Sequence, residues 1–170
     1  MSRVVLSVGS NLGDRLARLQ SVSDGLGDRM VAASGVYETD PWGGVDQESF
    51  LNAVVIAEDA DLDAHGWLRL AQQLERAADR VRDRKWGPRS LDVDLVTCFH
   101  GDAETVCADD ALTLPHPLAH LRAFVLVPWL AVDPDAMLTV SGTRFQVARL
   151  LDDVDAGERS GVRLTSLVLR

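Results

Sequence analysis

Two carboxylates stand on alternate residues directly after the most basic stretch of the chain. Asp92 and Asp94 flank Val93, and the alternation over residues 91–95 has the period of a half-buried strand. Both aspartates therefore project from one face, roughly 6–7 Å apart along the strand. Oxygen ligands at this spacing suit Mg²⁺, which takes one or two carboxylates and completes its shell with water and phosphate oxygens. The pair is a candidate magnesium site.

The segment before this pair supplies positive charge. It holds six of the seventeen Lys and Arg residues of the chain within fourteen positions, namely Arg76, Arg80, Arg82, Arg84, Lys85 and Arg89. Arginine binds phosphate through two parallel hydrogen bonds from a planar group. At residues 86–89 a tryptophan stands beside a Gly-Pro pair that interrupts regular structure. A basic loop and two aspartates predict a magnesium–polyphosphate site, although a solvated charged face and an exposed strand would also fit these patterns.

The chain has 170 residues and a net charge of −9, from 17 basic and 26 acidic residues. This length suits a single domain with its own core, and we expect one domain over residues 1–170. An acidic chain disfavours a general nucleic-acid binder, which needs a basic surface. We therefore expect no nucleic acid among its partners. We also expect a monomer that acts on small-molecule substrates and has no membrane partner.

Targeting signals and cysteine spacing indicate the compartment. No apolar run approaches the ~18–20 residues that a membrane span requires. The N-terminal residues enter a strand pattern without the layout of a signal peptide, so a cytoplasmic protein is expected. Cys98 and Cys107 match no zinc-binding spacing, and reduced thiols are expected, with a hairpin disulfide as the alternative.

Hydrophobic periodicity predicts strands alternating with helices. The expected strands cover residues 4–8, 31–37, 51–57 and 91–99, and the expected helices cover 12–26, 67–81 and 125–132, followed by a short strand from 137 and a helix near 144–151. Residues 162–169 have no clear assignment. This order predicts an α+β fold, an α/β sandwich on the ferredoxin-like split βαβ plan with additional C-terminal elements.

Other residues are candidates for binding or for structural roles. Phe50 and Asn52 alternate along one expected strand, so their side chains share a face. An aromatic ring beside a carboxamide is suited to binding a flat heterocycle. The ordinary alternatives are a Phe in the core and an Asn in a turn or helix cap. Gln72 and Glu75 lie on the helix face that leads to the basic loop. His116 stands in the Pro-rich turn 114–117, where a structural hydrogen bond is the ordinary role. The glycines at 9 and 13 lack the Lys-Ser/Thr of a phosphate loop.

Four separated segments resemble one enzyme family. GSNLGDR at 9–15, YETDPWGGVDQESFLNAVV at 37–55, WGPRSLDVDLV at 86–96 and LPHPLAHLRAFVLVPWLAVDP at 114–134 are similar to the 6-hydroxymethyl-7,8-dihydropterin pyrophosphokinase family of folate biosynthesis. The resemblance spans residues 4–135. It implies a ferredoxin-like fold and transfer of pyrophosphate from ATP to the hydroxymethyl group of the pterin, releasing AMP, with two Mg²⁺ ions.

The resemblance also implies site residues. Asp92 and Asp94 would bind the metal ions, and with Arg82 and Arg89 would form the catalytic set. The ATP-binding set would be Gln72, Glu75, Arg80, Arg82, Lys85, Trp86, Arg89, Thr113, His116 and Arg122. The pterin-binding set would be Thr39, Trp42, Phe50, Asn52, Asp92 and Phe124. Phe50 replaces a tyrosine that is frequent in the family, and Ala111 replaces a basic residue of some relatives.

Two other functions remain compatible with these residues. Another magnesium-dependent nucleotide phosphotransferase or hydrolase would release ADP or free phosphate instead of AMP. A non-catalytic nucleotide-binding module would bind the nucleotide without turnover.

Overall fold

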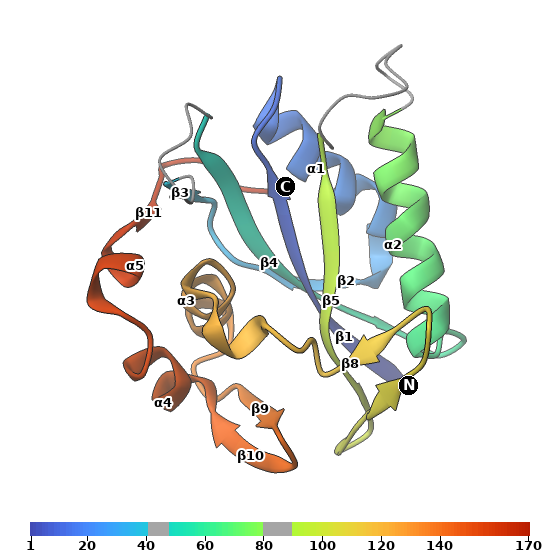
Figure 1. Ribbon diagram of the computed structural model, residues 1–170. Helices are drawn as coiled ribbons and strands as arrows, with labels where there is room; N and C mark the ends of the chain where they lie inside the picture. The colour runs from blue at the N-terminus through green and yellow to red at the C-terminus, as the bar shows by residue number, and fades with distance from the viewer. Residues whose placement is uncertain (41–47, 80–89) are drawn as a thin grey trace.

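The sheet is built around the N-terminal strand. The structure is a computed structural model that describes residues 1–40, 48–79 and 90–170. Strand β1 (Ser2–Ser10) pairs antiparallel with β4 (Phe50–Asp59) on one side and with β5 (Asp92–His100) on the other. Because β1 runs against both neighbours, its end meets their beginnings at one end of the sheet (Figure 1). This end carries Asn52 of β4 and Asp92 of β5.

Shorter strands extend the sheet on both sides. Within the described residues it has seven strands, in the order β11-β3-β4-β1-β5-β6, with β2 also paired to β4. The added strands are β2 (Met30–Ala33), β3 (Tyr37–Thr39), β6 (Ala103–Glu104) and β11 (Val162–Leu164). Two small hairpins lie outside the sheet and pair β7 (Cys107–Ala108) with β8 (Thr113–Leu114) and β9 (Met137–Val140) with β10 (Thr143–Gln146).

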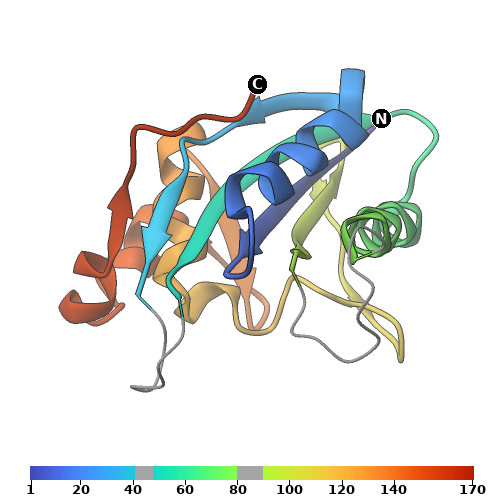
Figure 2. The same cartoon turned by 90° about the horizontal axis from the view of Figure 1, so that it is seen from above.

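Helices cover both faces of the sheet (Figures 1 and 2). Alternate residues of β1 separate two cores, with Val4, Leu6 and Val8 in one and Val5 in the other. The first core packs against α1 (Arg15–Leu26) and α2 (Ala64–Asp79), and the second against α3 (Ala123–Val132) and α4 (Val147–Asp152). Helix α5 (Ala156–Ser160) and the 3₁₀ turns Gly27–Arg29 and Ala119–Leu121 complete the elements of the described residues. The α+β class predicted from the sequence is confirmed.

Side-chain hydrogen bonds define where the helices on the first face begin. The Asp14 carboxylate accepts a hydrogen bond from the backbone N–H of Ala17 at the start of α1. Asp63 does the same for Gly66, just inside α2. Such caps satisfy N–H groups that the first helical turn leaves unpaired. They explain why α2 begins at Ala64, three residues before the predicted start.

Three element predictions differ from the structure. The strand expected over 31–37 is divided into β2 and β3, because Ser34 Oγ accepts the Val54 N–H that a strand carbonyl would otherwise take. The helix expected from residue 144 begins only at Val147, since Ser141 and Gly142 adopt positive φ and turn the chain into the β9–β10 hairpin. The unassigned stretch 162–169 contains β11, which pairs with β3.

The remaining expectations concern the Pro-rich turn, the thiols and membrane spans. The Leu114–Pro115 bond is cis within the predicted turn. Cys98 and Cys107 are free thiols, as expected. In the part of the chain that the structure describes, no helix has the length and apolar character needed to cross a bilayer.

Candidate active site

Polar residues line the end of the sheet on the face that α3 covers. Val5, Val54 and Val96 of this face belong to the core beneath α3. Because side chains alternate along a strand, Asn52, Asp92 and Asp94 lie on the same face, nearer the end of the sheet. In the register of the three strands, Gly9 is opposite Asn52 on β4 and opposite Asp92 on β5. Antiparallel pairing thus places a carboxamide and a carboxylate on either side of a residue without a side chain.

A cavity of about 330 Å³ opens above this row, and we call it the sheet-end cavity. Its lining residues are Ser7, Gly9, Thr39, Asp40, Phe50, Asn52, Asp92, Asp94, Arg122 and Phe124. They come from β1, β4, β5, the end of β3 with the residue after it, and the start of α3 with the residue before it. The structure therefore brings together five of the six residues of the predicted pterin-binding set. The sixth, Trp42, lies outside the described residues.

Two buried polar atoms at this cavity have no hydrogen-bond partner among the described residues. They are Thr39 Oγ1 and Asn52 Oδ1. Thr39 is 8% exposed and Asn52 is 5% exposed. A buried polar atom without a partner costs free energy that a bound ligand or water can recover. Both residues line a cavity that also contains an aromatic ring, Phe50. The chemistry of this wall suits a flat ligand with hydrogen-bonding edges.

The start of α3 contributes charge to the same cavity. The Arg122 guanidinium lies 5.6 Å from the centre of the Phe124 ring, within cation–π range. Arg122 was predicted from the resemblance to contact the nucleotide, yet it lines the sheet-end cavity beside Phe124. Its positive charge adds a smaller effect to burial, the main cause, in lowering the pKa of His116.

A second cavity, of about 530 Å³, lies between α2, β5 and β8, and we call it the α2–β8 cavity. Its lining residues include Gln72, Glu75, Arg76, Asp94, Leu112, Thr113 and His116. Four of the predicted ATP-binding residues are thus together here. Asp94 lines both cavities, so the two meet at this carboxylate.

His116 is held at this junction by its own backbone and ring. Its N–H donates to the carbonyl of Val96 over 2.8 Å, and its Nδ1 accepts a hydrogen bond from the N–H of Leu118. The ring proton of the neutral form therefore lies on Nε2. Burial lowers the pKa of His116, against the opposing effect of the Asp94 carboxylate. The ring is neutral near pH 7, and the structural hydrogen bond considered from the sequence is present.

The two aspartates fit a magnesium ion. Val93 between them is buried, whereas Asp92 is half-buried and Asp94 exposed, as strand alternation predicts. Both line the sheet-end cavity, and both offer only oxygen ligands. Mg²⁺ is bound in proteins by one or two such carboxylates together with water and phosphate oxygens. The donor set is therefore appropriate for the predicted ion.

Several predicted site residues lie outside the described part of the chain. They are Trp42, Arg80, Arg82, Lys85, Trp86 and Arg89. Conversely, the structure adds Ser7, Gly9 and Asp40 to the cavity walls. Strand alternation over residues 4–8, continued to Gly9, already indicates that Ser7 and Gly9 share a face. Asp40 had no comparable signal, because its place depends on β3.

Known proteins similar to this chain share one family. A family described as 7,8-dihydro-6-hydroxymethylpterin-pyrophosphokinase matches residues 5–134. A Mycobacterium tuberculosis protein named 2-amino-4-hydroxy-6-hydroxymethyldihydropteridine pyrophosphokinase is 61% identical over 169 residues, covering 96% of this chain and 90% of its own. A Mycobacterium leprae protein of the same name is 60% identical, covering 100% and 92%.

Solved structures are similar in fold at much lower identity. A crystal structure of wild-type Plasmodium falciparum HPPK-DHPS with pterin and p-hydroxybenzoate superposes with a TM-score of 0.63 at 13% identity, over 89% of this chain. This chain spans 42% of that longer chain. At this identity the similarity shows the fold alone. The family match and the mycobacterial relatives place the chain in the 7,8-dihydro-6-hydroxymethylpterin-pyrophosphokinase family.

Proposed function

We propose that this chain transfers pyrophosphate from ATP to the hydroxymethyl group of 6-hydroxymethyl-7,8-dihydropterin, giving AMP and the pterin pyrophosphate in folate biosynthesis. The observation that carries this proposal is the meeting of the two cavities at Asp94. One cavity suits a flat heterocycle, and the other is lined by polar residues of α2 and β8. A reaction between two substrates needs two such sites with a shared boundary, because the reacting atoms must come within about 3–3.5 Å of each other.

The sheet-end cavity is the proposed pterin site. Phe50 and Phe124 supply ring faces from β4 and α3, and the heterocycle lies between them. Asn52 Oδ1 and Thr39 Oγ1 lack partners within the described residues. At the edge of the ring, Asn52 Oδ1 accepts a hydrogen bond, and the Thr39 hydroxyl accepts or donates one. The hydroxymethyl group then points toward Asp92 and Asp94.

The α2–β8 cavity is the proposed ATP site. Gln72 and Glu75 face it from α2, Thr113 from β8 and His116 from the turn after β8. Arg122, just before α3, lines the adjoining sheet-end cavity. The neutral His116 ring is suited to donate a hydrogen bond from Nε2. Arg80, Arg82, Lys85, Trp86 and Arg89, whose roles rest on the resemblance, would complete the triphosphate side.

Asp92 and Asp94 are the proposed ligands of two Mg²⁺ ions. Bound magnesium would neutralise phosphate charge and polarise the attacking hydroxyl group. The two carboxylates fix the place of this charge, because they extend from a strand that is paired within the sheet. The chain's remaining contribution is to position substrates and to exclude water that would otherwise hydrolyse ATP.

The fold and setting are proposed on the same basis. The strand order β3-β4-β1-β5 with α1 and α2 on one face supports the ferredoxin-like plan. We further propose that residues 1–170 form a single domain, that the protein is a cytoplasmic monomer, and that neither nucleic acid nor membrane is among its partners. Analytical ultracentrifugation would test the oligomeric state.

Nucleotide analysis tests the reaction directly. The protein is incubated with Mg-ATP and 6-hydroxymethyl-7,8-dihydropterin, and the products are followed by ³¹P NMR. AMP should appear one-for-one with a pyrophosphorylated pterin, and EDTA should prevent both. ADP or free phosphate would instead indicate another phosphotransferase or a hydrolase. Nucleotide binding without turnover by folded protein would indicate a binding module.

A further inference from the structure

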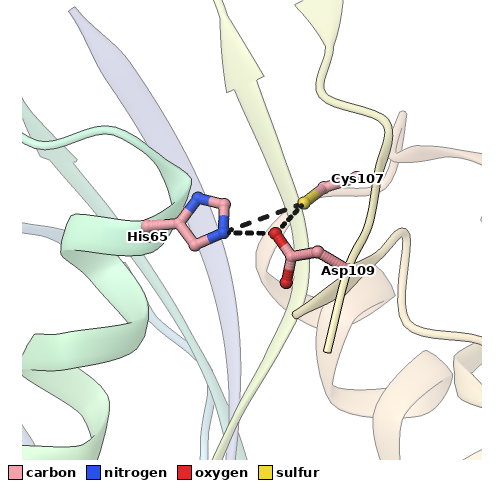
Figure 3. Close-up of side chains that lie close together, drawn as sticks. All are labelled: His65, Cys107 and Asp109. Carbon is pink, nitrogen blue, oxygen red and sulfur yellow. Dashed lines mark hydrogen bonds and ion pairs between the residues drawn. The ribbon is translucent and has the colours of Figure 1, made fainter. Parts of the chain in front are cut away.

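Three side chains with metal-ligating atoms meet away from the proposed active site (Figure 3). His65 lies in the first turn of α2, Cys107 in β7, and Asp109 in the turn of the β7–β8 hairpin. His65 Nε2 is 2.8 Å from Asp109 Oδ2 and 4.0 Å from Cys107 Sγ, and Cys107 Sγ is 3.5 Å from Asp109 Oδ2. The three ligand atoms therefore lie close enough together to hold one metal ion.

This geometry does not fit a nucleophilic cysteine. In a Cys-His-Asp catalytic arrangement, the thiol and the carboxylate contact opposite nitrogens of the imidazole, so that the ring can pass a proton. Here both Cys107 Sγ and Asp109 Oδ2 face the same nitrogen, Nε2, as Figure 3 shows. The arrangement is suited to chelation instead.

We propose that His65, Cys107 and Asp109 bind a divalent transition metal of the Zn²⁺ class, with water as the fourth ligand. Thiolate, imidazole and carboxylate are all ligands of Zn²⁺, and three protein ligands with one open position form a recognised type of zinc site. A tetrahedral ion with Zn–S near 2.3 Å and Zn–N or Zn–O near 2.1 Å holds its ligand atoms about 3.3–3.6 Å apart. The separations of 2.8, 3.5 and 4.0 Å in the structure bracket this range, so small side-chain rotations suffice.

The hairpin orients Asp109 for this role. Its Oδ1 accepts hydrogen bonds from the backbone N–H groups of Ala111 and Leu112, at 2.9 and 2.8 Å. This leaves Oδ2 facing His65 and Cys107, in the way that outer hydrogen bonds orient metal ligands elsewhere. The side chains of His65 and Asp109 are 41% and 46% exposed, so an ion can reach them from solvent.

This site differs from the proposed magnesium site in chemistry and in position. A thiolate favours zinc-class ions, whereas the oxygen-only pair Asp92 and Asp94 favours Mg²⁺. The cluster joins α2 to the β7–β8 hairpin, and both elements also line the α2–β8 cavity, through Gln72 and Thr113 respectively. A bound ion would therefore connect α2 to the β7–β8 hairpin, and none of its three ligands lines the cavity.

Cobalt titration of the full-length protein tests the proposal. The protein is stripped with a chelator and titrated with Co²⁺ in the presence of millimolar Mg²⁺, and the thiolate-to-cobalt charge-transfer band is followed. About one equivalent should bind, and Zn²⁺ should displace it. Cys107→Ser should abolish the band, and His65→Gln should weaken binding by at least about tenfold. Cys98→Ala, which removes the other thiol, should retain the band.

Other results would overturn the proposal. They are the absence of a band in the wild-type protein, a band that persists in Cys107→Ser, and unchanged affinity in His65→Gln. Hydrogen exchange gives a second measurement. Zn²⁺ should slow amide exchange at residues 107–114 in the wild-type protein but not in Cys107→Ser, and equal exchange with and without Zn²⁺ in the wild type would contradict the site. None of these measurements depends on pyrophosphokinase activity.

Discussion

Gly9 approaches Asn52 so closely that a β-carbon on Gly9 would lie 2.7 Å from Asn52 Nδ2. The two residues are opposite each other in the β1–β4 register. Gly9 does not adopt a positive φ, so glycine is needed here because a side chain would not fit, and not because of the backbone conformation. The absent side chain lets the Asn52 carboxamide lie at the wall of the sheet-end cavity.

Gly9→Ala should therefore impair the pterin site selectively. Displacing one buried amide that bonds the ligand costs about 1–3 kcal/mol, so the pterin should bind about ten- to a hundredfold more weakly. ATP affinity should be unchanged, because Gly9 does not line the α2–β8 cavity. Isothermal titration with each substrate measures both. Wild-type pterin affinity in Gly9→Ala would contradict the assignment.

Asp92→Ala and Asp94→Ala should each abolish turnover. Removing either carboxylate takes away a fixed charge where magnesium is expected, and losses of at least about 10²–10³-fold in kcat follow from comparable deletions. Both variants should fold normally, because Val93 and Leu95 still pack into the core. Asp102→Asn, on an exposed turn, is the control with one carboxylate fewer. Steady-state kinetics over a range of Mg²⁺ concentrations is the measurement, and substantial activity in either alanine variant would disprove the roles proposed.

Arg163 connects the C-terminal strand to the rim of the sheet-end cavity. Its two terminal nitrogens donate to both oxygens of Asp40, at 2.9 and 3.1 Å, and Asp40 lines the cavity. Arg163→Ala should raise the KM for the pterin several-fold and leave kcat nearly unchanged, because the wall is loosened while the reacting groups stay in place. Arg163→Lys should recover part of the effect, since lysine cannot form the paired bonds. A fall in kcat at constant KM would exclude this positioning role.

The same ion pair predicts a response to acid. The hydrogen bond from Arg163 is the main cause that lowers the pKa of Asp40 below its usual value of 3.8. A carboxyl with a lowered folded-state pKa stabilises the fold fully above the usual value, and this contribution is lost as pH falls through the lowered pKa. The contact of β11 with Asp40 should therefore weaken only below about pH 4. Carboxyl NMR titration should show the Asp40 pKa rising in Arg163→Ala. An identical Asp40 pKa in both proteins would refute this coupling.

Trp67 should contribute strongly to stability. It is almost fully buried beneath the sheet, and its Nε1 donates to Ser2 Oγ over 2.8 Å. Trp67→Ala should lower the free energy of unfolding by about 3–5 kcal/mol, through the lost contacts and the cavity left behind. Trp67→Phe should lower it less. Val106→Ala, at a side chain that is mostly exposed, should change it by less than about 0.5 kcal/mol. Urea denaturation measures all three, and a small loss in Trp67→Ala would contradict the packing described.

Much of the fold and part of the site could be predicted from sequence because they depend on local periodicity. Alternation over 91–95 determined that Asp92 and Asp94 share a face, and helical spacing identified the helix around Trp67. The family was also predicted from its four motifs, and this prediction is confirmed. Strand alternation, helical spacing and each motif taken singly depend only on residues close together in the chain.

Features that depend on distant partners were decided by the tertiary structure. Ser34 interrupts a predicted strand because it bonds Val54, twenty residues away, and β11 exists as a strand because β3 offers it an edge. His65 is 42 residues from Cys107, so no cysteine spacing could indicate their cluster. The row of Asn52, Gly9 and Asp92 likewise exists only in the register of three strands. Local sequence determines which way a side chain points, whereas pairing between remote segments determines what it meets there.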